Sequence, residues 1–139
     1  MDEMYTREYE VNKDDFAAAG EVSARIKRKL KQIGIDPSLI RKIAIASYEA
    51  EINMIIHSLG GLMSIAMDEQ NIIIICKDTG PGIPDIERAM QEGYSTASQS
   101  VREMGFGAGM GLSNINKNSD AMDIVSSPEG TTITMKFQY

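Results

Sequence analysis

The chain has 139 residues but only one cysteine and one histidine. A single cysteine excludes a disulfide framework within the chain, and Cys76 follows four isoleucines, so we expect a buried core thiol. We do not expect His57 to accept a phosphoryl group, since a histidine kinase presents that residue on a dimerising helical hairpin, for which we see no room. No apolar run reaches the roughly 18 residues of a membrane-spanning helix.

Basic residues are outnumbered, with 14 lysines and arginines against 20 aspartates and glutamates. The resulting net charge of −6 disfavours nucleic-acid binding. The acidic first residues, M-D-E-M-Y, do not match a signal peptide. We therefore expect one cytoplasmic domain, residues 1–139, that does not enter a membrane.

Two common phosphate-binding patterns are missing as well. The chain has no G-x-x-x-x-G-K-[ST] segment, and no G-x-G-x-x-G opens a strand–helix–strand unit. Glycine is nevertheless concentrated in two loops between Lys77 and Leu112, K-D-T-G-P-G-I-P and G-F-G-A-G-M-G-L. Neither Walker-type nor Rossmann-type binding is indicated, so these loops need a different explanation.

The first loop follows residues 72–76, an uncharged run rich in β-branched side chains, which predicts a buried strand. Asp78 leaves the end of this strand, where its carboxylate can accept a hydrogen bond from an amino group in a pocket. Gly80 and Gly82 favour a tight bend and let the backbone approach a flat ligand closely. Taken alone, this pattern also fits a simple turn with a solvated aspartate.

The second loop alternates glycine with other residues and then enters an expected helix, residues 112–118. Its glycines are Gly105, Gly107, Gly109 and Gly111. Such glycines expose backbone N–H groups toward an anion, and the dipole of the following helix favours negative charge there. The pattern predicts phosphate binding, with a flexible loop as the alternative.

A third element lies upstream, where Pro37–His57 has helical spacing and Asp36 is a plausible N-cap. Its expected apolar set is Ile40, Ile43, Ala44, Tyr48, Ile52 and either Ile55 or Ile56. Glu49 and Asn53 are four residues apart, so they share a face of the helix. On that face the carboxylate can act on a proton, and the amide oxygen can bind Mg²⁺. Glu51 points elsewhere, and we expect it to be a solvated surface charge.

The order E-x-x-x-N on a helix, D-x-G-x-G, and then G-x-G-x-G resembles the GHKL ATPase superfamily of gyrase, Hsp90, histidine kinases and MutL. The run D-T-G-P-G-I-P-D-I-E-R-A-M-Q-E-G-Y-S-T looks most like the bacterial anti-sigma serine/threonine kinases, including the stressosome switch kinase. The resemblance implies a Bergerat fold. That fold is an α/β (α+β) two-layer sandwich, with a mixed, mostly antiparallel sheet covered on one face by helices.

The resemblance also implies an ATP site with Mg²⁺. Asn53 would hold the metal, Glu49 would accept the proton of a substrate hydroxyl, and Arg102 in the lid, residues 93–104, would reach the γ-phosphate. The lid is longer than in the short anti-sigma kinases, which leaves the role of Arg102 open. The implied nucleotide-binding residues are Asn53, Asp78, Gly80, Gly82, Ile83, Ser95, Thr96, Gly107, Ala108, Gly109, Met110, Gly111, Leu112 and Thr131.

The remaining elements support this site. We expect an edge strand at residues 4–11 and a basic helix at residues 16–33 that ends at Gly34. The dipeptide at residues 60–61 should end the Glu49 helix. Further expected elements are a hairpin of residues 62–67 and 71–77, a short helix of residues 86–91, and a closing hairpin of residues 121–127 and 131–139.

Three functions follow in order of preference. The first is an ATP-dependent serine/threonine kinase of the anti-sigma type that phosphorylates a small anti-anti-sigma-like protein. The second is a nucleotide-switched module that binds a partner, such as a sigma factor or another regulator, with little or no phosphotransfer. The third is a plain ATPase. The basic helix is either a solvated face or a docking surface for an acidic partner, and the edge strand would permit a homodimer.

Overall fold

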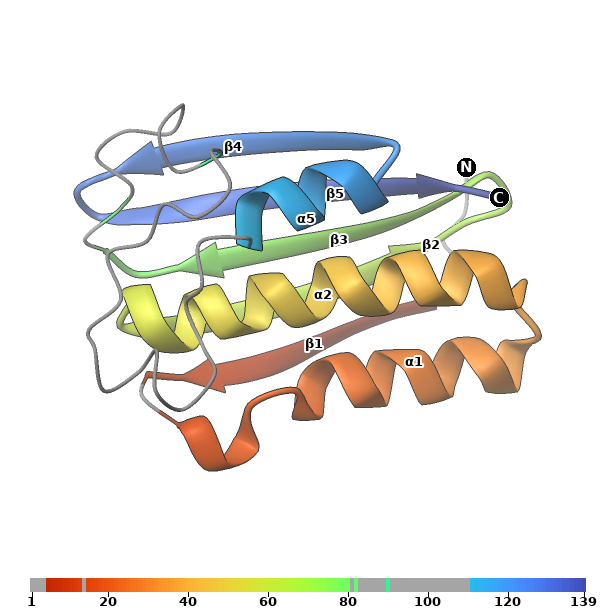
Figure 1. Ribbon diagram of the computed structural model, residues 1–139, viewed down its shortest axis with the longest axis horizontal. Coiled ribbons are helices and arrows are strands. Elements are labelled where there is room, and N and C mark those ends of the chain that lie inside the picture. Colours follow the sequence, from red (N-terminus) through yellow and green to blue (C-terminus); the bar gives the residue numbers. More distant parts are fainter. Residues whose placement is uncertain (1–4, 14, 81, 83–89, 91–110) are drawn as a thin grey trace.

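The computed structural model describes residues 5–13, 15–80, 82, 90 and 111–139. Five strands form one sheet in the order β1-β2-β3-β5-β4 (Figure 1). They are β1 (Tyr5–Asn12), β2 (Gly60–Met67), β3 (Asn71–Asp78), β4 (Ala121–Ser127) and β5 (Gly130–Gln138).

All four neighbouring pairs of the described strands are antiparallel, which confirms the mostly antiparallel sheet, and no parallel pair occurs among these strands. Two hairpins, β2–β3 and β4–β5, pair with each other through β3 and β5. Strand β1 adds to the outside against β2, in register from Tyr5 opposite Met67 to Asn12 opposite Gly60. The expected edge position of β1 is confirmed.

The helices cover one face of this sheet, which confirms the two-layer α+β sandwich (Figure 1). They are the 3-10 helix η1 (Phe16–Ala18), α1 (Glu21–Ile33), α2 (Pro37–His57) and α5 (Gly111–Asn118). Helix α2 lies in the middle and packs against both α1 and α5. Within the described ranges, no helix combines the length and hydrophobicity that crossing a membrane requires.

The core lies between the two layers and follows the strand alternation. On β3, Ile72, Ile74 and Cys76 are buried under the helices, whereas Ile75 and Lys77 are exposed on the opposite face. Cys76 is therefore the core thiol that the sequence predicts, and burial raises the pKa of this thiol.

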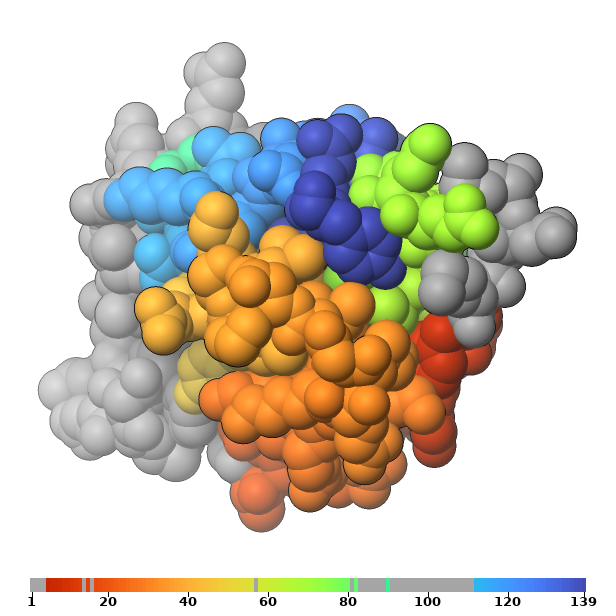
Figure 2. Space-filling model, turned by 90° about the vertical axis from the view of Figure 1, so that its right-hand side faces the viewer, coloured from red at the N-terminus to blue at the C-terminus, as the bar shows by residue number. Residues whose placement is uncertain are grey.

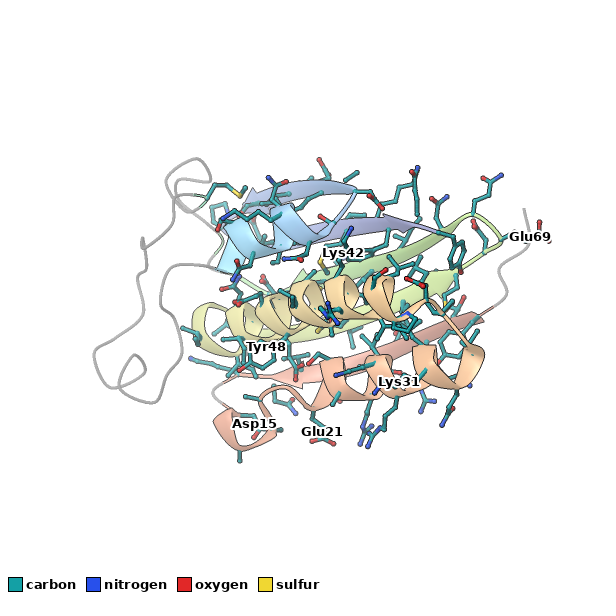
Figure 3. All side chains as sticks on the ribbon, turned by 45° about the vertical axis from the view of Figure 1, so that its right-hand side comes forward. Asp15, Glu21, Lys31, Lys42, Tyr48 and Glu69 are labelled. Atoms are coloured by element: carbon teal, nitrogen blue, oxygen red, sulfur yellow. The ribbon has the colours of Figure 1, made fainter. Side chains whose placement is uncertain are left out.

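Helix α2 has the bounds that the sequence predicts. Asp36 Oδ2 accepts the backbone N–H of Ser38 at 3.1 Å, which confirms the N-cap, and Pro37 occupies the first turn. Buried members of the predicted apolar set are Ile40, Ile43, Ile52 and Ile55. Tyr48 was wrongly included, because it is 38% exposed and its ring lies near Gly20 instead of against the sheet (Figure 3).

Glu51 is the clearest correction on this helix, since it is 1% exposed and not a solvated surface charge. Its carboxylate accepts backbone N–H groups of Gly20, Val22 and Ser23 at 3.0–3.2 Å. Gly20 has no side chain to cap α1, so Glu51 supplies the cap from α2. Burial raises the pKa of the Glu51 carboxyl, and the three N–H bonds oppose that rise.

Two boundaries also differ from expectation. The first helical segment does not run unbroken over residues 16–33, because Gly20, with φ of +88°, separates η1 from α1. Residues 60–61 open β2 and do not end α2, which stops at His57. Ser58 makes the transition, since its hydroxyl donates to Met54 O at 2.6 Å and accepts Gly60 N–H at 3.0 Å.

The end of the molecule shown in Figure 2 brings together the start of α2, the β2–β3 turn and the chain's last residues. The turn forms as predicted, with Asp68 Oδ1 accepting backbone N–H groups of Gln70 at 2.7 Å and Asn71 at 2.8 Å. The backbone N–H of Tyr139 donates to Gln70 O at 3.3 Å. The predicted glycine-loop site belongs to the opposite end of the sheet.

Candidate functional site

Four structural elements meet at that opposite end (Figure 1). They are the second half of α2, the end of β3, the start of α5 and the turn between β4 and β5. Because β3 and β5 are antiparallel neighbours, the last residue of β3 lies beside the first residues of β5. The fold therefore brings distant segments of the sequence to one region. Glu49 and Glu129, for example, are 80 residues apart in the sequence.

Asp78 is fixed at the end of β3. Its Oδ1 accepts the backbone N–H of Thr131 at 2.8 Å. Burial raises the pKa of the Asp78 carboxyl, and the Thr131 hydrogen bond partly opposes that rise. Thr131 is buried, and its hydroxyl lies 2.8 Å from the Ser126 hydroxyl across the β4–β5 hairpin. The structure thus joins Asp78 and Thr131 directly, through a hydrogen bond from the Thr131 backbone to the Asp78 side chain that the sequence did not predict.

The chain after Asp78 is held from both sides. Thr79 makes two backbone hydrogen bonds with the segment after α2. Its N–H donates to Gly60 O, and its carbonyl oxygen accepts the N–H of Leu59, both at 3.0 Å. The next residue, Gly80, donates its N–H to Glu129 O in the β4–β5 turn. The first glycine loop is consequently anchored to the connection between α2 and β2 and to the β4–β5 turn before it leaves the sheet.

Gly80 and Gly82 occupy positions where a side chain does not fit. A Cβ on Gly80 would lie 2.5 Å from Pro128 O, and a Cβ on Gly82 would lie 2.1 Å from Ser127 O. Gly82 also has a φ of +87°, which L-residues rarely adopt. These glycines therefore let the loop approach the β4–β5 turn closely, whereas the sequence predicted a close approach to a flat ligand.

Glu49 and Asn53 lie one helical turn apart on α2, and both are half-buried. Glu49 Oε1 accepts a hydrogen bond from Asn114 Nδ2 at 3.1 Å. Asn114 belongs to α5, whose first residue is Gly111, the last glycine of the second loop. The contact brings the Glu49 carboxylate to the first turn of that helix.

Helix α5 confirms the predicted helix after the second loop, although it begins one residue earlier, at Gly111. Leu112 is buried in the core. It can therefore serve a ligand only through its backbone, while its side chain fixes the helix to the sheet. The predicted site residues Ile83, Ser95, Thr96, Arg102, Gly107, Ala108, Gly109 and Met110 lie outside the described residues, as does the predicted helix at residues 86–91 apart from Met90.

Sequence reasoning missed Asn114 and Ser126. Asn114 follows the glycine loop by three residues, and an amide in the first turn of a helix below an anion site is a signal that could have been used. Ser126 carries no such signal, because only the β4–β5 register brings it opposite Thr131.

The arrangement fits a nucleotide with a metal-bound triphosphate. A partly buried carboxylate at Asp78 suits an exocyclic amino group, and the start of α5 suits phosphate oxygens. Within the described residues no three histidine, cysteine, aspartate or glutamate side chains gather as a metal cage. An amide oxygen such as that of Asn53 matches the few protein ligands that Mg²⁺ takes when phosphates supply the others.

Comparison with known proteins is consistent with this geometry. The model of the histidine kinase-like ATPase domain family matches residues 13–137. An anti-sigma F factor of Bacillus licheniformis is 32% identical over 108 residues, which cover 71% of this chain and 70% of that protein. The serine/threonine-protein kinase RsbT of Bacillus subtilis is 28% identical over 124 residues, which cover 86% of this chain and 85% of the kinase.

Two solved structures share the fold. A structure of the RsbU and RsbW domains of a Mycobacterium tuberculosis protein superposes with a TM-score of 0.66 at 20% identity. The match covers 96% of this chain and 32% of that longer one. The SiaB–SiaC complex of Pseudomonas aeruginosa contains a chain that superposes with a TM-score of 0.57 at 12% identity, covering 99% of this chain and 91% of that chain.

The family match spans all of the elements that build the site, from the helix that carries Glu49 and Asn53 to the strand that begins beside Asp78. The GHKL resemblance expected from the glycine loops is confirmed, and the chain belongs to the family of histidine kinase-like ATPase domains.

Proposed function

We propose that the protein is an ATP-dependent serine/threonine protein kinase that acts in the cytoplasm as a regulator of the anti-sigma type. The observation that carries this proposal is that Asp78, held by Thr131 at the end of β3, lies at the same end of the sheet as the Glu49–Asn114 pair, which joins α2 to the start of α5 (Figure 1). The relatives named as an anti-sigma F factor and as a serine/threonine-protein kinase support it. We propose a small anti-anti-sigma-like protein as its substrate.

Adenine recognition falls to Asp78. With Oδ1 held by the Thr131 N–H, Oδ2 is the oxygen that we assign to the adenine amino group. Gly80 and Gly82 hold the loop beside Asp78, because the lack of side chains lets it pack closely against the β4–β5 turn. The Thr131 hydroxyl, 2.8 Å from Ser126, is the group that we assign to a water bridging to the base.

Phosphate binding falls to the N-terminus of α5. Its first backbone N–H groups are directed away from the helix, and its dipole favours anionic oxygens. When bound, Mg²⁺ would neutralise the charge of the phosphates, and Asn53 would be its protein ligand. The predicted contribution of Arg102 to the γ-phosphate remains part of this proposal.

Transfer then depends on Glu49. Its carboxylate accepts the proton of the substrate serine or threonine hydroxyl as that oxygen forms a bond to the γ-phosphorus and the bond from phosphorus to ADP breaks. Asn114 holds Glu49 Oε1, which leaves Oε2 for this proton. Asn114 is thus a positioning residue rather than a catalytic one.

The test is transfer of labelled γ-phosphate from ATP into proteins of the native cytosol, with nucleotide binding measured in parallel. A single small labelled protein would support a kinase. Tight ATP binding without a labelled product, together with partner binding that differs between ADP and ATP, would favour a nucleotide-switched binding module. Rapid phosphate release without any partner would favour a plain ATPase and overturn the proposal.

A further inference from the structure

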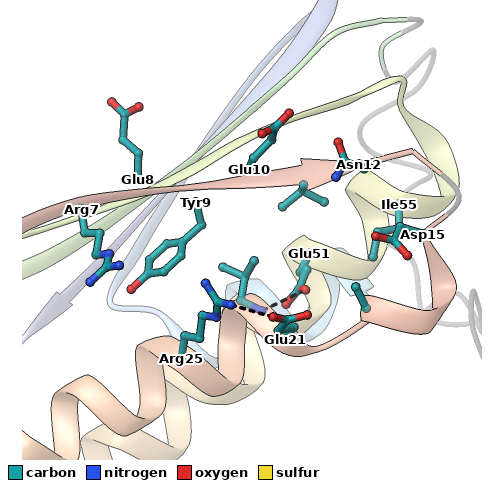
Figure 4. A pocket seen from close by; sticks show the side chains of 13 residues that line it. Arg7, Glu8, Tyr9, Glu10, Asn12, Asp15, Glu21, Arg25, Glu51 and Ile55 are labelled. Carbon is teal, nitrogen blue, oxygen red and sulfur yellow. Dashed lines mark hydrogen bonds and ion pairs between the residues drawn. The ribbon is translucent and has the colours of Figure 1, made fainter.

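A second recessed surface lies away from the nucleotide site, between the outer edge of β1 and the start of α1 (Figure 4). It encloses about 330 Å³. All six consecutive residues from Arg7 to Asn12 line it. Because successive strand residues point to opposite faces, a cavity lined by six of them in a row runs along the edge of the strand. We call this surface the β1 groove.

The β1 groove borders an edge that can pair with another strand. Among the described strands, β1 pairs with β2 alone, so its outer edge presents backbone N–H and C=O groups. Helix α1 packs mainly on α2, and its first turns lie beside this edge and not across it (Figures 1 and 4). The edge is therefore open to strand addition, and α1 would cover the side chains of an added strand.

Part of the inner wall of the groove is apolar, whereas polar and charged side chains make up most of its lining. Val11, Val22 and Ile55 line it, and all three are buried. Glu51 lies beside them, but its carboxylate is engaged by the backbone N–H groups that begin α1. A volume of about 330 Å³ is near the lower limit of ligand pockets, which suits one or two large side chains better than a whole cofactor.

The outer side of the same edge is acidic. Glu8 and Glu10 are exposed on the face of β1 that the helices do not cover, opposite Ser64 and Leu62 of β2, which carry no charge. The nearby arginines have other contacts: Arg25 pairs with Glu21 at 2.8 Å, and Arg7 lies over the Tyr9 ring at 5.5 Å. Two alternate glutamates therefore set the charge that an added strand meets.

This charge disfavours a second copy of β1. In a symmetric antiparallel pair that keeps both helical layers on one side, residues of the same face stand opposite each other. If the two-fold axis of such a pair passes at residue 8, 9 or 10, a glutamate at position 8 or 10 of one copy stands directly opposite a glutamate of the other copy. Like charges directly opposite one another destabilise a strand pair.

We propose that the β1 groove binds an extended segment of a partner protein, which adds to β1 as a new edge strand. The segment carries lysine or arginine at alternate positions opposite Glu8 and Glu10. Between them it places a large apolar side chain in the cavity against Val11, Val22 and Ile55. Main-chain hydrogen bonds supply affinity in this mode, and the alternate side chains supply specificity.

The test uses three fluorescent peptides that need no nucleotide: K-V-K-F-K-V-K, E-V-E-F-E-V-E, and K-V-K-A-K-V-K. Two cross-strand ion pairs of about 0.5–1 kcal/mol each predict that the lysine peptide binds about tenfold more tightly than the glutamate peptide. Replacing the central phenylalanine by alanine weakens binding by about tenfold or more, because its ring fills the cavity. Bound lysine peptide should slow amide hydrogen exchange within residues 5–12.

Charge reversal separates this site from general attraction to an acidic protein. The double variant Glu8→Lys/Glu10→Lys should prefer the glutamate peptide. The matched variant Glu69→Lys/Asp123→Lys makes the same charge change at exposed positions on the β2–β3 turn and on β4, and it should keep the original preference. Equal effects of the two double variants, or exchange protection confined to residues outside 5–12, would overturn the proposal, whatever the outcome for ATP.

Discussion

The side-chain amide of Asn114 donates a hydrogen bond to the carboxylate of Glu49 across 3.1 Å, and so ties the first turn of α5 to the middle of α2. These residues are 65 positions apart in the sequence. The contact orients a carboxylate that would otherwise rotate about three side-chain bonds. It also makes the geometry of Glu49 depend on the helix that follows the second glycine loop.

Replacing Asn114 by alanine tests this dependence. We expect kcat for phosphoryl transfer to fall about tenfold, because Glu49 loses its orienting bond, while KM for ATP changes little. Steady-state kinetics with ATP and the unphosphorylated partner protein as substrates separate the two constants. Asn118→Ala is a suitable control, since it removes an amide from the same helix but not one that contacts Glu49. Equal losses in both variants would indicate damage to α5 instead of misplacement of Glu49.

Asp78→Asn should separate ligand binding from folding. The asparagine carbonyl can still accept the Thr131 N–H, so the fold is retained. Loss of a charge-assisted bond of about 1.5–3 kcal/mol predicts that ATP affinity falls about 10- to 100-fold. Isothermal titration with ATP measures the change, and Asp68→Asn in the β2–β3 turn should bind ATP as the native chain does.

The same variant makes a prediction about pH. Burial raises the pKa of Asp78 above its unfolded value, so ionising it costs folding free energy. Its favourable contribution is present below an unfolded pKa of about 4 and is lost as pH rises through the folded pKa. Asp78→Asn should consequently gain free energy of unfolding relative to the native chain as pH increases from about 3 to 7. Urea unfolding across that range measures the difference, and a difference independent of pH would contradict the assignment.

Glu51 should matter for stability more than any surface carboxylate. Glu51→Ala leaves three backbone N–H groups at the start of α1 without their acceptor, which predicts a loss of about 3 kcal/mol in free energy of unfolding. Glu21→Ala, four residues before its exposed partner Arg25, should lose less than about 0.5 kcal/mol. Comparable losses from the two substitutions would show that Glu51 does not cap α1.

Gly82 and Gly34 form a matched pair for the first glycine loop. Both have positive φ, +87° and +92°, but a Cβ at Gly82 would meet Ser127 O at 2.1 Å whereas one at Gly34 meets nothing within 4 Å. Gly34→Ala should cost about 1–2 kcal/mol from backbone strain alone, and Gly82→Ala at least about 1 kcal/mol more. Urea unfolding of both variants tests this order.

Local patterns in the sequence predicted much of this structure. The N-cap at Asp36, the bounds of α2 and the β2–β3 turn depend on interactions between neighbouring residues, which composition and spacing reveal. The two glycine loops, together with the E-x-x-x-N motif of the Glu49 helix, also predicted the family, because these three short motifs occur in a fixed order. Their positions in the described structure agree with that order at Glu49, Asp78 and Gly111.

Contacts between distant segments were not predictable in this way. Glu51 looked like a surface charge because helical spacing places it off the face of Glu49, and nothing local shows that the start of α1 packs there. Tyr48 was placed in the core because it fits the helical spacing of the apolar residues, but it is partly exposed beside Gly20. The Glu49–Asn114 bond likewise depends on the packing of α2 against α5.

The central claim is that Glu49 accepts the proton during phosphoryl transfer. The most direct measurement is single-turnover transfer of labelled γ-phosphate to the partner protein by the native chain, by Glu49→Gln and by the surface control Glu69→Gln. We predict that Glu49→Gln binds ATP normally but transfers about 10²- to 10⁴-fold more slowly, whereas Glu69→Gln is unaffected. Transfer by Glu49→Gln at the native rate would contradict the account.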